Sequence, residues 1–152
     1  MSRIPRYGAK TDCALALWVK LARAFATVSK HSQEDIRSYG LTQPQFGVLE
    51  SLGHLGTITL GDLSRKQLTS CANITLVVDN LEEQGLVERR PCDEDRRVSY
   101  VRLTGKGKRL FRRIFPHHAR YMSSLLSTLT QEEQLKLGAL LKKLGTSLQP
   151  FD

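Results

Sequence analysis

The feature that most constrains the fold is an amphipathic segment followed directly by two short β-rich segments. Between residues 71 and 84 the apolar residues recur at i, i+3, i+4 and i+7, so they share one face of a helix: Ile74, Val77, Val78 and Leu81. Gly85 suits the position just past the end of such a helix. The β-rich segments 86–90 and 98–103 follow, and the loop 91–97 between them is too long and too charged for a tight two-residue turn. This order predicts a helix beside a projecting β-hairpin.

Further helices are predicted ahead of this segment. Apolar residues at helical spacing indicate a first helix over residues 10–38. Thr42 and Gln45 have the spacing of a capping box and predict the start of a second helix, which we expect to be broken by Gly53 and Gly56. A short extended piece at 57–59 and a third helix at 61–68 then lead to the segment described above.

Two more helices are predicted after the hairpin. Thr104 is placed to cap a fifth helix that reaches about residue 127, with Pro116 expected to kink it. Thr130 and Glu133 form a second capping-box pattern at the start of a final helix. Leucines line one side of that helix: Leu137, Leu140, Leu141, Leu144 and Leu148.

The order of elements predicts a mainly α fold with a small β-hairpin (α+β), of the winged helix-turn-helix type. We interpret the chain, 1–152, as a single domain whose lobe for nucleic-acid binding covers about residues 42–104. The long helices of about 10–38 and 105–148 exceed what such a lobe needs, and their apolar stripes call for a partner. A two-fold homodimer is the simplest arrangement that covers them, so these segments are interpreted as a dimerisation region.

Positive charge is concentrated beside the predicted hairpin. The chain carries 23 Lys or Arg against 15 Asp or Glu, a formal net charge of +8. Between Leu86 and Arg120 there are 11 Lys or Arg and 4 Asp or Glu, so almost the whole excess lies in that one stretch. A contiguous basic stretch is typical of a surface that binds a polyanion, and a winged helix-turn-helix makes double-stranded DNA the expected partner.

The outer face of the fourth predicted helix carries the residues expected to read DNA. These are short hydrogen-bonding side chains and one apolar side chain, which suit base edges, thymine methyl groups and phosphates: Ser70, Asn73, Thr75, Leu76 and Asn80. An ordinary solvent-exposed face is the alternative interpretation. The preceding helix and the basic hairpin after it favour contact with the major groove.

The predicted wing supplies the second set of candidate DNA-binding residues. Arg89 and Arg90 lie on the strand that enters the loop, and Arg96 and Arg97 lie where the chain leaves it. Arginine inserted into a narrow minor groove is stabilised by the negative potential there. Among the loop acids, Asp95 is the one placed to pair with an arginine and hold its guanidinium. The alternative is a charged surface turn.

Several segments resemble the MarR family of bacterial transcriptional regulators. The likeness is carried by the run from Asn73 to Pro91 (NITLVVDNLEEQGLVERRP), by DRR at 95–97 and by LTGKG at 103–107. It extends upstream to GLTQPQF at 40–46 and downstream to LTQEE at 129–133, and so covers about residues 10 to 148.

The resemblance implies a homodimeric repressor that binds a pseudo-palindromic operator and is released by a small-molecule or oxidant signal. By the family motif, Arg97 matches the wing-tip arginine that enters the minor groove, and Asp95 matches the acid that braces it. Residues 70–75 match the end of the recognition helix that reads the major groove. Many members carry an arginine or another polar residue after the threonine at position 75, and here Leu76 favours methyl contact or packing.

Candidates for the sensing site follow from the same resemblance. Aromatic residues on the helices are the candidates for an effector pocket, with burial in the core as the alternative: Trp18, Phe25, Phe46 and Phe115. Cys13, in the first helix, and Cys71, at a helix N-terminus where the dipole favours a thiolate, are the redox candidates. His117 and His118 are adjacent rather than four residues apart, so no metal site is predicted, and no cofactor is expected.

Other functional classes are disfavoured by the sequence. It has no phosphate loop, nucleophile elbow or zinc motif, so we do not expect an enzyme and predict no catalytic residues. No apolar run approaches the ~20 residues that span a bilayer, and three cysteines without close spacing fit a reducing cytoplasm. The remaining alternative is a winged-helix module that makes protein contacts or binds nucleic acid without sequence preference and without a ligand switch.

Overall fold

The computed structural model describes residues 7–95 and 97–148, and the chain divides into two compact units after His118. The first unit contains α1 to α4, a small sheet and the larger part of α5, and the second contains the end of α5 and α6. The elements in chain order are α1 (Ala9–Ser38), α2 (Gln43–Leu55), β1 (Ile58–Thr59), α3 (Leu60–Lys66), α4 (Cys71–Glu83), β2 (Val87–Pro91), β3 (Ser99–Leu103), α5 (Gly105–Leu125) and α6 (Gln131–Leu148). The predicted mainly helical fold with a β-hairpin is confirmed.

Side-chain caps fix where the predicted helices begin. At α2 the Thr42 hydroxyl accepts a hydrogen bond from the Gln45 backbone N–H at 3.3 Å, and the Gln45 side chain accepts one from the Thr42 N–H at 2.9 Å. Glu133 and Thr130 form the same reciprocal pair at α6. The backbone N–H and the hydroxyl of Thr130 donate to the Glu133 carboxylate, and these hydrogen bonds hold the pKa of Glu133 below its usual range. Both predicted capping boxes are confirmed.

The prediction that Gly53 breaks the second helix is wrong. Helix α2 continues through Gly53 to Leu55 and ends at Gly56, whose φ of 79° is in the left-handed region. A Cβ atom at Gly53 would lie 2.5 Å from the ring of Phe111 on α5. The glycine therefore makes room for an aromatic ring, which is a packing requirement that the local sequence does not reveal.

The hairpin belongs to a three-stranded antiparallel sheet in the order β1-β3-β2. In β2 and β3, Val87 pairs with Leu103 at the inner end and Pro91 with Ser99 at the outer end. The two-residue strand β1 adds to the free side of β3 through the pairing of Ile58 with Val101. The sheet thus ties the segment before α3 to the base of the hairpin, which holds the wing beside the helix-turn-helix.

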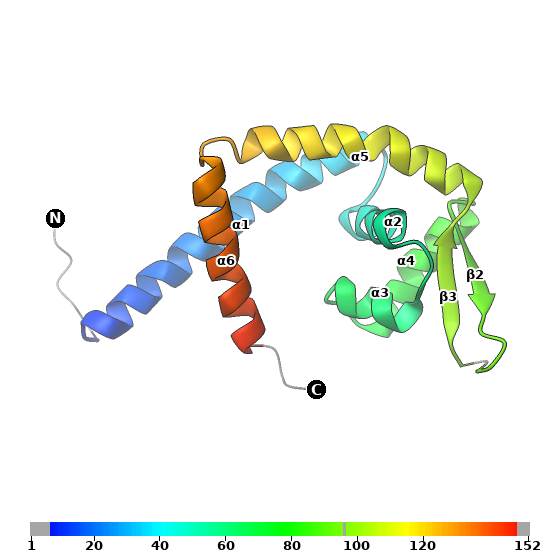
Figure 1. Ribbon diagram of the computed structural model, residues 1–152, viewed down its shortest axis with the longest axis horizontal. Helices are drawn as coiled ribbons and strands as arrows, with labels where there is room; N and C mark the ends of the chain where they lie inside the picture. Colours follow the sequence, from blue (N-terminus) through cyan, green and yellow to red (C-terminus); the bar gives the residue numbers. More distant parts are fainter. Residues whose placement is uncertain (1–6, 96, 149–152) are drawn as a thin grey trace. The chain divides into compact units, whose positions relative to one another are not determined.

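The core of the first unit forms on both sides of α2. One side receives the inner face of α4, where Val78 and Leu81 are fully buried. The other side receives α5, whose Phe115 stacks on Phe46 with ring centroids 6.5 Å apart and whose Ile114 is buried. Helix α2 therefore lies between α5 and the pair formed by α3 and α4, as Figure 1 shows.

The second unit contains α6, whose apolar side chains face the solvent. Among the described residues of α6 none is buried, and its leucine stripe is open to solvent. No helix in the described part of the chain combines the length and apolar character that crossing a membrane requires.

Candidate nucleic-acid interface

The outer face of α4 presents most of the predicted DNA-reading side chains to solvent. Ser70 caps the helix by accepting a hydrogen bond from the Asn73 N–H at 3.2 Å. The Asn73 amide donates to the Thr69 hydroxyl at 3.3 Å, which orients it at the start of the helix. Leu76 is 63% exposed, and Asn80 is exposed one turn further on. An apolar side chain flanked by amides thus faces the solvent, as recognition of a thymine methyl group requires.

Thr75 is more constrained than the sequence suggested. Its hydroxyl donates to the Cys71 carbonyl at 2.7 Å, and the residue is half-buried. The hydroxyl hydrogen is therefore committed within the helix, so only the oxygen lone pairs remain for a ligand. Cys71 is itself exposed, with its Sγ atom 3.4 Å from the Ser64 hydroxyl.

Arg89 lies on β2, but its side chain is held by α4. The guanidinium lies 2.6 Å from the Asp79 carboxylate and 2.8 Å from that of Glu82, and it donates to the Thr75 carbonyl at 3.2 Å. Glu82 also accepts a hydrogen bond from the backbone N–H of Arg89 at 3.0 Å. Because only 23% of its side chain is exposed, Arg89 joins the wing to α4 instead of projecting toward a ligand.

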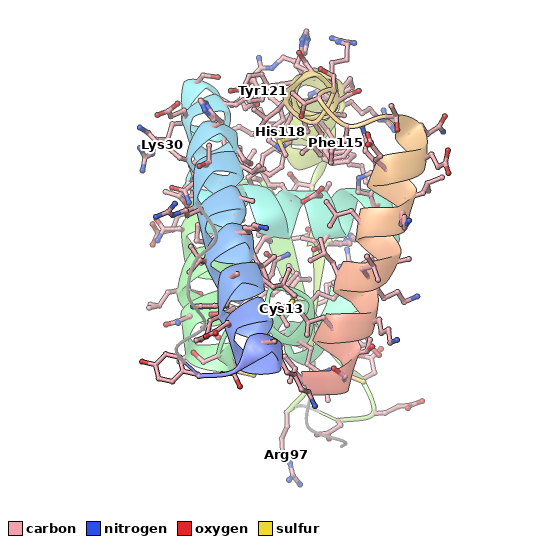
Figure 2. The ribbon with its side chains drawn as sticks, turned by 90° about the vertical axis from the view of Figure 1, so that its left-hand side faces the viewer. Cys13, Lys30, Arg97, Phe115, His118 and Tyr121 are labelled. Carbon is pink, nitrogen blue, oxygen red and sulfur yellow. The ribbon has the colours of Figure 1, made fainter. Side chains whose placement is uncertain are left out.

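The wing tip has the opposite character. The Arg97 side chain is 95% exposed and projects from the loop away from the helices of the first unit (Figure 2). Asp95 accepts a hydrogen bond from the backbone N–H of Arg97 at 2.9 Å, whereas its oxygen is 3.8 Å from the guanidinium. Asp95 therefore shapes the turn more than it restrains the side chain. Arg90 is exposed on β2, and Arg96 lies outside the described residues.

The structure separates the four aromatic candidates for an effector pocket. Phe46 is buried in the core and stacks on Phe115, whereas Trp18 and Phe25 on α1 are 64% and 71% exposed. Beside the buried pair lies His118, which packs against the Phe46 ring at 4.6 Å and is shown next to Phe115 in Figure 2.

The sequence did not indicate a polar pair beside these rings, formed by the buried His118 and the half-buried Asp35. The Nδ1 atom of His118 lies 2.7 Å from the Asp35 carboxylate of α1, and the Tyr39 hydroxyl donates to the same carboxyl group at 3.2 Å. The pair joins residues 83 positions apart in the chain, so no local pattern indicates it. It ties the end of α1 to α5 next to the core of the first unit.

Polar contacts also hold α3 in its place ahead of α4. The Gln67 amide donates to the Gly47 carbonyl at 2.9 Å and to the Ser51 hydroxyl at 2.8 Å, which fastens the end of α3 to α2. At the start of α3, the Asp62 carboxyl accepts hydrogen bonds from Thr59 and pairs with Arg65. Both contacts lower the pKa of Asp62, and the hydrogen bond from the Thr59 side chain has the larger effect. These contacts set the geometry of the helix-turn-helix.

The last candidates from the sequence are the cysteines proposed as redox sites. Cys13 is exposed on α1, and its proposed redox role, like that of Cys71, stays a prediction. In the ranges that the structure describes, no group of three or more His, Cys, Asp or Glu side chains is arranged to hold a metal ion.

An exposed helix of a helix-turn-helix and a neighbouring arginine-tipped hairpin define a winged helix-turn-helix DNA-binding protein. The MarR family model matches residues 41–99. The HTH-type transcriptional regulator MhqR of Bacillus subtilis is 36% identical over 141 residues, which are 93% of this chain and 97% of MhqR. The chain belongs to the MarR family of transcriptional regulators. Its relatives are regulators and not enzymes, as predicted.

Solved structures of the family share the fold. An Escherichia coli MarR variant complexed with operator DNA is 27% identical, with a TM-score of 0.72 over 83% of this chain and 94% of that one. BpsR from Bordetella bronchiseptica, whose DNA binding is regulated by 6-hydroxynicotinic acid, is also 27% identical, with a TM-score of 0.76 over 86% of this chain and 98% of that one.

Proposed function

We propose that the protein is a homodimeric repressor that binds a pseudo-palindromic operator and is released by a small-molecule or oxidant signal. The observation that carries this proposal is the pairing of an exposed face on α4 with an almost fully exposed Arg97 on the same lobe. Two such lobes related by a two-fold axis match the symmetry of a palindromic site. A repressor of this kind acts by occupying promoter DNA.

In the proposed complex α4 enters the major groove and the wing enters the adjacent minor groove. Asn73 and Asn80 are the candidates for hydrogen bonds to base edges, and Leu76 is the candidate for contact with a thymine methyl group. Ser70, which caps the start of the helix, is the candidate for a phosphate contact. Arg97 then contributes through the negative potential of a narrow minor groove, with Arg90 on the phosphate backbone.

The proposed dimer rests on apolar surface outside the DNA-binding lobe. On α1, Trp18 and Phe25 are seven residues apart and both exposed, so they share one unburied face. On α6 the leucine stripe is likewise exposed. Exposed apolar side chains that share one face of a helix are typical of a protein–protein interface. We therefore assign about residues 10–38 and 105–148 to dimerisation, and 42–104 to DNA binding.

Two observations support the proposed release of the protein from DNA by a ligand: the regulation of a structural relative and the packing of the DNA-binding lobe against α1 and α5. DNA binding by BpsR is regulated by a small aromatic acid. In this chain the core behind α4 is joined to α1 and α5 through Phe46, Phe115 and the pair of Asp35 with His118. A ligand or oxidant that displaces either helix would shift the lobe through these contacts.

The proposal is tested by a titration of the protein with DNA. A duplex from the promoter region of its own gene and a random-sequence duplex of equal length are compared at physiological salt. We expect a preference of several decades, at least ~10³, for the promoter duplex. Equal affinity for both duplexes would favour the alternative of a winged-helix module that binds without sequence preference.

A second test addresses the wing. The Arg97→Ala variant is expected to weaken DNA binding and to lower the slope of log K against log salt by about 0.9, because one cation leaves the phosphate surface. The oligomeric state and thermal midpoint should stay unchanged, since the side chain is 95% exposed. An unchanged affinity would show that the loop is a solvated turn.

A further inference from the structure

The structure shows that the excess positive charge is not on the wing. From Leu86 to Thr104 the chain has five Arg against four acids, so this part is nearly neutral. From Gly105 to Arg120 it has six Lys or Arg and no acid. The basic stretch that the sequence presents as one binding surface therefore divides into a mixed wing and a purely cationic helix α5.

Five of the cations of α5 form one exposed face in the first unit. We call this set the basic face: Lys106, Lys108, Arg109, Arg112 and Arg113. Apolar residues of the same turns point inward, where Ile114 is buried and Phe111 packs on Gly53. Within the described ranges, none of the five cations pairs with a carboxylate. Lys106 donates to the Gln84 carbonyl at 2.7 Å, and the others keep their charge open to solvent.

Apart from Lys106, which reaches the Gln84 carbonyl at the end of α4, the basic face lies across α2 from the reading surface. Helix α2 separates α5 from α3 and α4, because Phe46 packs on Phe115 of α5 while α4 packs on the other side of α2 (Figure 1). A duplex bound along α4 therefore leaves the outer side of α5 uncovered. The exposed apolar residues that argue for the dimer lie on α1 and α6 and not on this side of α5. We therefore expect these cations to make little direct contact with the operator.

We propose that the basic face binds the phosphate backbone of a second DNA duplex without regard to sequence. Lys106, Arg109 and Arg113 stand at i, i+3 and i+7 and span about 10 Å along the helix, a distance that matches about three phosphates of one strand. The face includes three arginines, whose planar guanidinium groups bind phosphate oxygens in pairs. A protein bound to its operator thereby holds another DNA segment on its outer side.

The composition of the face favours DNA over other acidic partners. A helix that inserts into a lipid surface exposes apolar side chains, but the apolar side of α5 is packed on α2. A protein partner is usually anchored by a large apolar residue at the centre of the interface, and the basic face has none between residues 105 and 113. A cationic surface without an apolar anchor fits a phosphate backbone.

The test is a two-duplex capture assay with the full chain. A biotinylated random-sequence duplex on beads is loaded with protein, washed, and offered a fluorescent duplex of different sequence. The triple variant Arg109→Gln, Arg112→Gln, Arg113→Gln is expected to stay on the bead duplex but to capture the second duplex roughly tenfold less. The salt slope of the second capture should fall by about 0.9 for each arginine removed.

Two further variants keep the assay decisive. The α6 variant Lys136→Gln, Lys142→Gln, Lys143→Gln removes the same charge from another exposed helix and should capture as the parent protein does. The variant Arg109→Lys, Arg112→Lys, Arg113→Lys should recover most of the capture. If the α6 variant loses as much capture of the second duplex as the α5 glutamine variant, net charge alone explains the effect and the proposal fails. Undiminished capture by the α5 glutamine variant would also overturn the proposal.

Two further experiments test which surface of the protein captures the second duplex and whether DNA is the preferred polyanion. The double variant Asn73→Ala, Arg97→Ala tests whether the two reading surfaces of a dimer hold the two duplexes. If the second duplex is lost in this variant but still captured by the α5 variant, the reading surfaces account for the capture and the basic face does not. Vesicles of phosphatidylglycerol and poly-glutamate replace the second duplex in parallel. A larger effect of the α5 variant on either of them than on DNA would overturn the assignment to a duplex.

Discussion

At the scale of single residues, the wing arginines lie in two environments that their sequence context does not distinguish. Arg97 is almost fully exposed at the tip, whereas Arg89 is mostly enclosed by Asp79, Glu82 and the Thr75 carbonyl. The three partners stand at i, i+4 and i+7 on α4, which places them along one side of the helix. Arg89 therefore holds α4 against β2 and pairs with two acids that would otherwise repel the phosphates of the proposed operator.

This assignment predicts an indirect effect of Arg89 on DNA binding. We expect Arg89→Ala to lower the free energy of unfolding by about 1–2 kcal/mol, because charged hydrogen bonds are lost at a partly exposed site. DNA affinity should fall while the salt slope stays unchanged, and Asp79→Asn with Glu82→Gln should restore part of the affinity in the Arg89→Ala background. Chemical denaturation and salt-dependent titrations measure these quantities.

The comparison with Arg97→Ala supplies the control for this prediction. Removal of a cation that touches phosphate lowers the salt slope by about one, and a positioning residue leaves it unaltered. A fall of that size in Arg89→Ala would place Arg89 directly on the DNA and contradict the role assigned to it.

At the scale of elements, the wing and α5 meet at one close backbone approach. Helix α5 starts with the Thr104 hydroxyl donating to the Gly85 carbonyl at 2.7 Å and accepting from the Gly107 N–H at 3.1 Å. A Cβ atom at Gly107 would lie 2.0 Å from the backbone oxygen of Leu86. The second glycine of LTGKG is therefore needed for steric reasons, because α5 and the start of β2 are in contact there.

Substitution of that glycine is expected to be costly. Gly107→Ala should lower the free energy of unfolding by about 1–3 kcal/mol, since the backbone has to move to admit the methyl group. Gly105→Ala is the matched control, because its nearest neighbour would be the flexible end of Arg109 at 3.5 Å. Equal stability of the two variants in urea denaturation would show that α5 can shift without penalty.

Features that depend on neighbouring residues could be predicted from the sequence, and those that depend on tertiary contacts could not. The capping boxes at Thr42 and Thr130 were predicted because a cap is formed within four residues. The continuation of α2 through Gly53 was missed because Phe111 comes from a helix much later in the chain. The same limit applies to the enclosure of Arg89, whose acids lie on a different element.

At the scale of the whole molecule, the distribution of apolar surface is the strongest indication of a second copy. The core of the first unit lies around α2, whereas Leu137 and Leu144 on α6 are 44% and 41% exposed, on the same helix face. Exposure of a complete leucine stripe is unfavourable in water at roughly 25 cal/mol for each Å² left uncovered. The proposed dimer, formed through this stripe, would remove that penalty.

The proposed dimer makes a prediction that couples assembly to DNA binding. Leu137→Glu with Leu144→Glu would place two charges in an apolar interface. We therefore expect a monomer in sedimentation equilibrium, and an unchanged helix content in circular dichroism. Lys136→Gln with Lys142→Gln changes the net charge equally outside the stripe and should remain dimeric. Because linked lobes make the second half-site contact intramolecular, the monomer should bind promoter DNA at least ~10²-fold more weakly. A leucine variant that stays dimeric would remove α6 from the interface.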